Sequence, residues 1–234
     1  MSAALACTVI ELRQYTLRTG QRDVLIELFD REFVEAQEAV GCMVIGQFRD
    51  LDDANRFVWL RGFADMAARA RALQAFYGGP VWETQRERAN ATMIDSDDVL
   101  LLRPATAPAF ALPRRPPLAG PNGQADGGIV VATICPLASP AGPDLLEHYQ
   151  RAIEPALRER GASILGVFST ESSPNNFARL PVREGVQVFS WLAGHHDRTG
   201  AQSAAAALDS LRPWLGGPAQ VLRLAPTARS RLQA

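Results

Sequence analysis

Hydrophobic and polar positions along the chain predict the same order of strands and helices in each half. In the first half, alternating apolar and polar residues predict four strands: 8–16, 42–48, 56–62 and 99–103. Apolar residues at helical spacing predict three helices between them: 25–40, 64–77 and 81–93. Gly41 follows the first of these helices, where a left-handed cap suits glycine.

The second half carries the same pattern with fewer helices. Its predicted strands are 129–135, 163–169, 186–193 and 220–224, and its predicted helices are 143–160 and 202–211. Pro155 lies inside the first of these helices and is expected to kink it, because proline lacks the amide donor that the helix needs.

Four short matches in the same order indicate an internal duplication. Segments 41–48, 57–65, 78–80 and 99–104 of the first half resemble 161–168, 189–197, 216–218 and 221–226 of the second. The order β-α-β-β-α-β is that of a ferredoxin-like unit. We therefore expect an α+β protein built from two fused ferredoxin-like repeats.

A segment rich in proline and glycine separates the repeats. Between residues 104 and 128 it holds six prolines and four glycines, which exclude a central strand or a helix. We expect a first repeat over residues 1–104, an extended linker over 105–127 and a divergent second repeat over 128–234. Phe110 and Leu112 could anchor the linker on the fold.

Composition removes several classes of function. The 24 basic residues balance 25 acidic ones, and all 24 are arginine. A near-zero net charge argues against nucleic acid as a partner. The lack of lysine excludes a Schiff-base lysine, a pyridoxal-phosphate anchor and a Walker-type phosphate loop.

Targeting and redox signals are also missing from the sequence. The first residues do not resemble a signal peptide, and no apolar run reaches the length of about 18 residues that a membrane span needs. Cys7, Cys42 and Cys135 are far apart and are expected to be small buried residues rather than a disulfide or metal site. We expect a cytoplasmic protein without membrane contact.

Polar and aromatic side chains share one face of two strands that neighbour each other in a ferredoxin-like unit. These residues are Glu11, Arg13, Tyr15, Phe57, Trp59 and Arg61. We expect this face to be the helix-free one, so that the sheets of the two repeats meet through it and bury Trp59 and Trp191 near a pseudo-two-fold axis. Leu12, Val58 and Leu60 would then pack on the helices.

Two interpretations of this polar group stay open. Buried charges cost several kcal/mol unless they are paired, so the group is either an ion-pair network that fixes the packing or the wall of a ligand pocket. The second repeat has Val131, Thr133 and Ala193 where the first has Glu11, Arg13 and Arg61. Any pocket is therefore asymmetric, with the second repeat as a lid or wall.

Histidine offers little support for metal or haem chemistry. His148 falls on a predicted helix, whereas His195 and His196 close a strand, so that one of these two would reach the space between the repeats. A haem enzyme would need one of the three as axial ligand, and none has a recognisable context. We predict no metal site and no cofactor.

Three motifs carry a resemblance to a known family. Residues 11–15 with Gly20, residues 56–63 and residues 77–82 resemble NIPSNAP-family domains over about residues 8–104. The second half resembles a divergent member of the same dimeric α/β-barrel superfamily. The resemblance implies repeats that pair sheet to sheet, within one chain or between two. Relatives in that superfamily include cofactor-free monooxygenases, lactone isomerases and haem enzymes, and no catalytic set carries over.

The functional expectation is a pocket for a small aromatic or anionic molecule. Arg13 and Arg61 would hold it, because guanidinium groups bind carboxylate or phenolate oxygens in a fixed fork. Phe57, Trp59, Trp191 and His195 would line it. One alternative is a cofactor-free monooxygenase, isomerase or lyase with Glu11 or Tyr15 as proton carrier. The other is a non-catalytic interaction module, and a homo-oligomer stays open.

Overall fold

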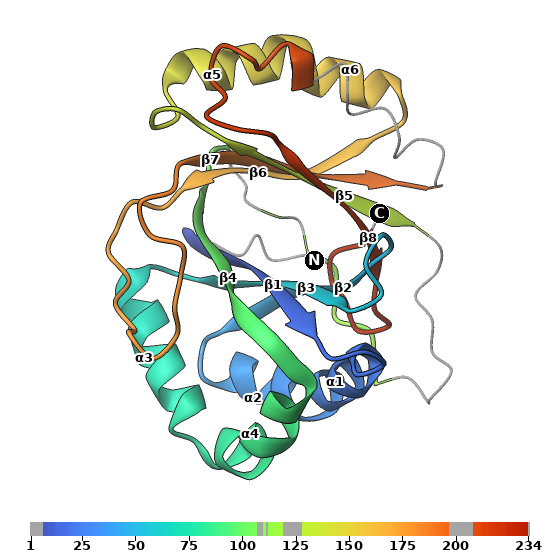
Figure 1. The fold of residues 1–234 in the computed structure, drawn as a ribbon, viewed down its shortest axis with the longest axis vertical. Helices are drawn as coiled ribbons and strands as arrows, with labels where there is room; N and C mark the ends of the chain where they lie inside the picture. Colours follow the sequence, from blue (N-terminus) through green and yellow to red (C-terminus); the bar gives the residue numbers. More distant parts are fainter. Residues whose placement is uncertain (1–6, 107–109, 111, 119–127, 197–207, 234) are drawn as a thin grey trace.

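The protein forms one closed antiparallel barrel of eight strands (Figure 1). This computed structural model describes residues 7–106, 110, 112–118, 128–196 and 208–233. The first repeat supplies β1 (Val9–Leu17), β2 (Met43–Asp50), β3 (Arg56–Phe63) and β4 (Met93–Pro104). The second supplies β5 (Ile129–Pro136), β6 (Ser163–Thr170), β7 (Val188–His195) and β8 (Gln220–Pro226). The strand order around the barrel is β1-β3-β2-β8-β5-β7-β6-β4.

The two repeats share strand order and register, which confirms the predicted duplication. In one direction around the barrel the order is β4-β1-β3-β2 in the first repeat and β8-β5-β7-β6, the equivalent order, in the second. Arg13 lies opposite Trp59, and Thr133 lies opposite Trp191. Even the irregularities correspond, because the register shifts before Gly46 in one repeat and before Gly166 in the other.

Two short seams close the barrel within the single chain. At one seam β2 pairs with β8, where Phe48 lies opposite Pro226. At the other, β4 pairs with β6, where Leu102 lies opposite Thr170. The sheets of the two repeats therefore face one another, as expected, and the pairing is within one chain.

Aliphatic side chains fill the barrel interior. They come from both repeats and include Leu12, Leu60 and Leu192. The linker contributes as well, since Phe110 and Leu112 are buried in the same cluster and Phe110 stacks on Phe168 at a centroid distance of 5.3 Å. The interior is thus a packed core that the linker helps to close.

Each repeat places its helices on the outside of the barrel (Figure 1). The first has α1 (Arg22–Leu28), η1 (Phe29–Phe33), α2 (Val34–Ala39), α3 (Met66–Tyr77) and α4 (Pro80–Thr92). The second has α5 (Pro143–His148), η2 (Tyr149–Ile153) and α6 (Glu154–Glu159). Most of the helix predicted at 202–211 lies outside the described residues.

The wide π-helical turns η1 and η2 occupy the same place in both repeats. The amide of Val34 donates to the carbonyl of Phe29, and the amide of Glu154 donates to that of Tyr149. In the second repeat this turn lies just before Pro155, where a kink was expected, but the first repeat has the same turn without a proline. The turn is therefore a property of the repeat, and it seats an aromatic ring on the sheet tryptophan: the centroid distance is 4.8 Å for Phe29–Trp59.

The prediction of which sheet face meets the other repeat was wrong. Trp59 and Trp191 pack under the helices of their own repeats, whereas Leu12, Val58 and Leu60 point into the barrel. The physical reason is that both faces of each sheet are buried. The alternation of side chains therefore cannot show which face meets the helices and which faces the barrel interior. Large rings find partners in the aromatic helix layer, and branched aliphatic side chains fill the narrow interior.

Two compositional expectations can be compared with the fold. Cys7, Cys42 and Cys135 are buried and free, as predicted. Burial raises the pKa of all three thiols, to about 11 for Cys7 and Cys42. Within the described ranges, no helix combines the length and apolar character that crossing a membrane requires.

Candidate functional site: a buried arginine cluster

The carboxylate of Glu11 joins three buried arginines beneath the helices of the first repeat. Arg13 Nη1 donates to Glu11 Oε2 at 2.6 Å, and Arg61 Nε donates to the same oxygen at 2.8 Å. Arg69 Nε donates to Glu11 Oε1 at 2.6 Å. No side chain in this arginine cluster (Glu11, Arg13, Arg61 and Arg69) is more than 1% exposed.

Strand and helix geometry bring these side chains together. Glu11 and Arg61 lie opposite each other on the neighbouring strands β1 and β3, and Arg13 lies two residues farther along the same face. Arg69 comes from the buried face of α3, which begins at an Asp65 cap that accepts from the amide of Ala68 at 2.6 Å.

The cluster holds three positive charges against one negative charge. Burial alone would raise the pKa of Glu11, but Arg61, Arg13 and Arg69 hold it far below its usual range. Glu11 is therefore ionised at neutral pH and joins the arginines as a counter-ion. This argues against Glu11 as a proton carrier and leaves Tyr15 as the candidate.

Aromatic rings form one wall of the cluster. Tyr15 meets Trp59 edge to face at a centroid distance of 5.9 Å and meets Phe57 at 6.4 Å. The guanidinium carbon of Arg61 lies 5.1 Å from the centroid of Trp59, and Arg13 Nε donates to the Tyr15 hydroxyl at 3.1 Å. The rings and the guanidinium groups therefore form one continuous buried layer.

Several donors of the cluster make no hydrogen bond of standard geometry to the described residues. Arg61 Nε donates to Glu11, and Arg61 Nη1 donates to Gln37 Oε1 at 3.1 Å. Arg61 Nη2 donates no hydrogen bond of standard geometry. Arg69 Nη2 and Trp59 Nε1 are buried without an acceptor too. Buried donors are nearly always satisfied, so three in one place need an explanation.

A segment of the second repeat completes the site. Residues 171–187, between β6 and β7, reach down to α3, as Figure 1 shows in orange. Arg69 Nη1 donates to Asn175 Oδ1 at 3.1 Å and to Asn176 Oδ1 at 2.8 Å. Phe177 packs on Tyr77 at a centroid distance of 6.0 Å. The expected contribution of the second repeat is thus a loop, not its sheet.

Two predicted ligand residues lie elsewhere. Trp191 packs on Tyr149, at 5.4 Å between centroids, under the helices of the second repeat. His195 is buried at the end of β7, opposite Ile129. Neither contacts the arginine cluster, because the helix-facing sides of the two sheets point away from each other.

Sequence reasoning missed Arg69, Gln37, Tyr77 and the two asparagines. Arg69 had a readable signal: it interrupts the apolar stripe that Met66, Leu73 and Phe76 form at helical spacing. The asparagines had none, because they lie far along the chain in a loop whose path depends on barrel closure.

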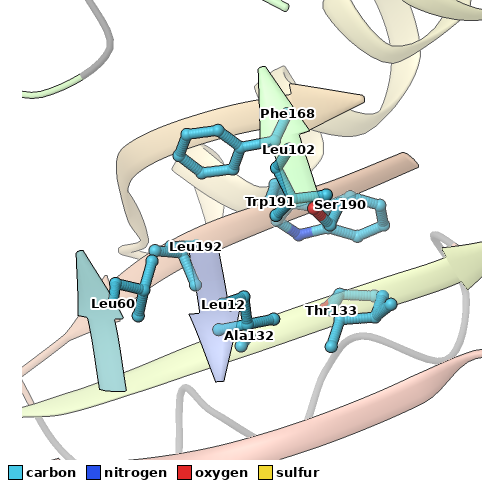
Figure 2. A pocket seen from close by; sticks show the side chains of 10 residues that line it. Leu12, Leu60, Leu102, Ala132, Thr133, Phe168, Ser190, Trp191 and Leu192 are labelled. Carbon is cyan, nitrogen blue, oxygen red and sulfur yellow. The ribbon is translucent and has the colours of Figure 1, made fainter. Parts of the chain in front are cut away.

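A small cavity lies on the opposite side of the sheet, inside the barrel (Figure 2). Its volume is about 10 Å³, enough for one water molecule. Leucines from both repeats wall it, among them Leu12, Leu60 and Leu192, and the hydroxyl of Ser190 lies beside it. Because it is small and mostly apolar, we do not place the site there.

The fold and register define a fused dimeric α/β-barrel protein, in which two ferredoxin-like repeats of one chain close a barrel. Residues 10–108 match the model of the NIPSNAP family, so the first repeat is a NIPSNAP domain. No curated protein matches the sequence of this chain.

Solved structures with the same full-length fold come from distant proteins. A protein named "Putative monooxygenase" from Fusobacterium nucleatum is 9% identical with a TM-score of 0.56, over 95% of this chain and 93% of that one. One of the same name from Lactobacillus acidophilus is 10% identical with a TM-score of 0.55, over 94% of each chain. An anthrone oxidase-like protein is 12% identical with a TM-score of 0.54, over 99% of this chain and 98% of that one.

Proposed function

We propose that the arginine cluster of the first repeat binds a small organic anion, a carboxylate or phenolate carried on a flat aromatic body. The observation that carries this proposal is the charge count. Three buried guanidinium groups face one carboxylate, and Nη2 of both Arg61 and Arg69 makes no hydrogen bond of standard geometry to the described residues.

The energetic argument is that unpaired buried charge is expensive. Removing an ion from water costs several kcal/mol, which is recovered only with a partner of opposite charge in good geometry. A planar carboxylate suits two guanidinium donors, and charge-assisted hydrogen bonds are about twice as strong as neutral ones. An anion at Arg61 and Arg69 would therefore stabilise the cluster.

The aromatic wall favours a ligand with a ring. Trp59 and Tyr15 lie beside the guanidinium donors, and Trp59 Nε1 adds one more donor. Small-molecule sites usually combine an apolar lining with a few convergent polar groups. A substituted benzoate or a polycyclic phenolate has this combination of body and charge.

A cofactor-free oxygenase is the second candidate, and the full-length fold shared with proteins named as monooxygenases and as anthrone oxidase-like favours it. The arginines would stabilise a phenolate, and the Tyr15 hydroxyl, which accepts from Arg13, would carry the proton. With O2 as the oxidant, a methylene group between two aromatic rings becomes a carbonyl, and the second oxygen atom leaves as water with the two hydrogens of the methylene group. Oxygen uptake with polycyclic phenols tests this chemistry.

The direct test of the binding site compares benzoate with benzamide, its neutral isostere. Titration calorimetry is expected to show benzoate binding to the wild type and no benzamide binding at the same concentrations. Arg69→Met should abolish benzoate binding, whereas Arg151→Met, whose side chain is 78% exposed, should not. Equal binding of benzoate and benzamide by the wild type would overturn the proposal, and the absence of benzoate binding would favour a non-catalytic packing network.

A further inference from the structure

The segment 171–187 of the second repeat covers a charged face that belongs to the first repeat. We infer that Asn175 and Asn176 determine access to the arginine cluster: their amide oxygens hold Arg69, and an anionic ligand exchanges for them. This inference rests on the proposed function of the cluster. It assigns a gating role to residues outside the NIPSNAP domain.

The side-chain amides of Asn175 and Asn176 accept hydrogen bonds from Arg69 but do not neutralise its charge. Asn176 Oδ1 lies 2.8 Å from Arg69 Nη1, and Asn175 Oδ1 lies 3.1 Å from it. A carboxylate at either place would give a stronger bond, because both partners would then be charged, and it would reduce the charge imbalance. Neutral acceptors are therefore the ones that an anionic ligand can displace from Arg69.

The segment is anchored at both ends and only lightly at its tip. The amides of Glu171 and Arg183 donate to carbonyls of β4, those of Leu101 and Val99, at 2.9 Å each. Between these anchors most side chains are exposed, and Phe177 is the buried apolar one. Segments with few buried apolar contacts open locally at low free-energy cost. The tip can therefore move while both ends keep their strand contacts.

The contact of the tip with the first repeat is correspondingly small. Asn176 Nδ2 donates to the carbonyl of Met66 at 2.6 Å, and Phe177 packs on Tyr77. Asn176 thus bridges the first turn of α3 and the guanidinium of Arg69, which makes it the residue most directly exchanged when an anion enters.

The loop between the second and third strands differs in length between the repeats, which explains why only the first repeat has its charged face covered. In the first repeat, β2 and β3 are joined by residues 51–55, whereas 171–187 join β6 and β7. The longer loop extends from the repeat that lacks the charges, where Thr133 and Ala193 replace Arg13 and Arg61. Each repeat therefore contributes what the other lacks, which gives a reason for their fusion.

Two substitutions at one position test the inference in opposite directions. Asn176→Ala removes the competing acceptor and should strengthen benzoate binding about fivefold, the net contribution of one typical hydrogen bond. Asn176→Asp supplies the negative charge within the chain and should weaken benzoate binding at least about tenfold, the equivalent of a charged pair. Asn175→Asp should weaken it in the same way if Asn176→Asp fails to fold.

The control is Asn90→Asp, which makes the same charge change on the exposed surface of α4 and should leave the affinity unchanged. If both Asn176 variants lose affinity alike, the segment only supports the site, and the proposed gating role of Asn176 is wrong. If both variants bind benzoate as the wild type does, the gating role is wrong, but the proposal that the arginine cluster binds an anion is unaffected. If the wild type does not prefer benzoate to benzamide, the proposed function itself fails.

Discussion

Arg61 lies opposite Glu11 across β3 and β1, and its Nε donates to Glu11 Oε2 at 2.8 Å with both side chains fully buried. This pair fixes the centre of the arginine cluster, because Arg13 and Arg69 bind the same carboxylate. The cluster therefore depends on one negative charge for its stability and on the spare guanidinium donors for its proposed function.

Removing the charge of Glu11 is expected to destabilise the protein strongly. Glu11→Gln keeps the shape but leaves three buried guanidinium groups without a counter-ion. Breaking a buried ion pair at one partner costs about 3–5 kcal/mol. Urea denaturation of this variant, with Glu147→Gln on exposed α5 as control, measures the loss. A loss below about 1 kcal/mol would show that the arginines do not depend on Glu11.

Trp59 and Trp191 form a natural matched pair, because both are buried between sheet and helices at equivalent positions. Trp→Phe keeps most of the apolar volume, so each variant should lose about 1–3 kcal/mol of stability. Only Trp59→Phe should weaken benzoate binding, because it removes the spare Nε1 donor from the cluster. Calorimetric titration of both variants decides, and an equal effect of the two would place the ligand elsewhere.

Because the pKa of Asp30 is raised in the folded protein, we expect the free energy of unfolding to fall as the pH rises. This carboxyl in η1 accepts from Gln47 Nε2 at 2.9 Å. Burial raises its pKa from 3.8 to about 6, although Gln47 and Arg229 oppose the rise. The folded protein thus keeps a proton that the unfolded chain releases, so the contribution of Asp30 falls by about 3 kcal/mol between pH 3.8 and about 6.

Asp30→Asn should flatten the stability profile over that pH range, while Asp209→Asn, at a site 70% exposed, should not. Urea unfolding at pH steps from 4 to 7 gives the two profiles. A slope that persists in Asp30→Asn would assign the pH dependence to another group.

Phe110 is expected to stabilise the barrel from within the linker. It is 3% exposed and stacks on Phe168, so Phe110→Ala should cost about 3–5 kcal/mol through lost burial and a cavity. Leu118→Ala, farther along the linker and 54% exposed, should cost less than about 0.5 kcal/mol. Similar losses for the two in thermal unfolding would mean that the linker does not close the core.

The sequence was sufficient for the repeat architecture and for part of the site. Periodicity and the duplicated segments predicted the order of elements along the chain, and strand alternation placed Glu11, Arg13 and Trp59 on one face. Alternation is a relative signal, so it could not say which face meets the helices when both are buried. That is why Trp191 was expected beside Trp59 although the two lie on opposite outer faces of the barrel.

Residues that arrive from distant segments were out of reach. Arg69 comes from a helix after the strands, and Asn176 comes from the other repeat, 107 residues away along the chain. Their meeting depends on closure of the seam between β4 and β6, which no local pattern encodes. A charge inside an apolar helical stripe, as at Arg69, is the signal that sequence reasoning can use.

The most direct test of the account is a crystal structure of the protein grown with 4-bromobenzoate, with the bromine located by anomalous scattering. We predict one bromine peak between the sheet and the helices of the first repeat. The carboxylate should lie about 3 Å from Nη2 of Arg61 and from both Nη1 and Nη2 of Arg69, with Asn176 withdrawn from Arg69 Nη1. A peak inside the barrel, under the second helix layer or only on the surface, with the arginine cluster unchanged, would contradict the account.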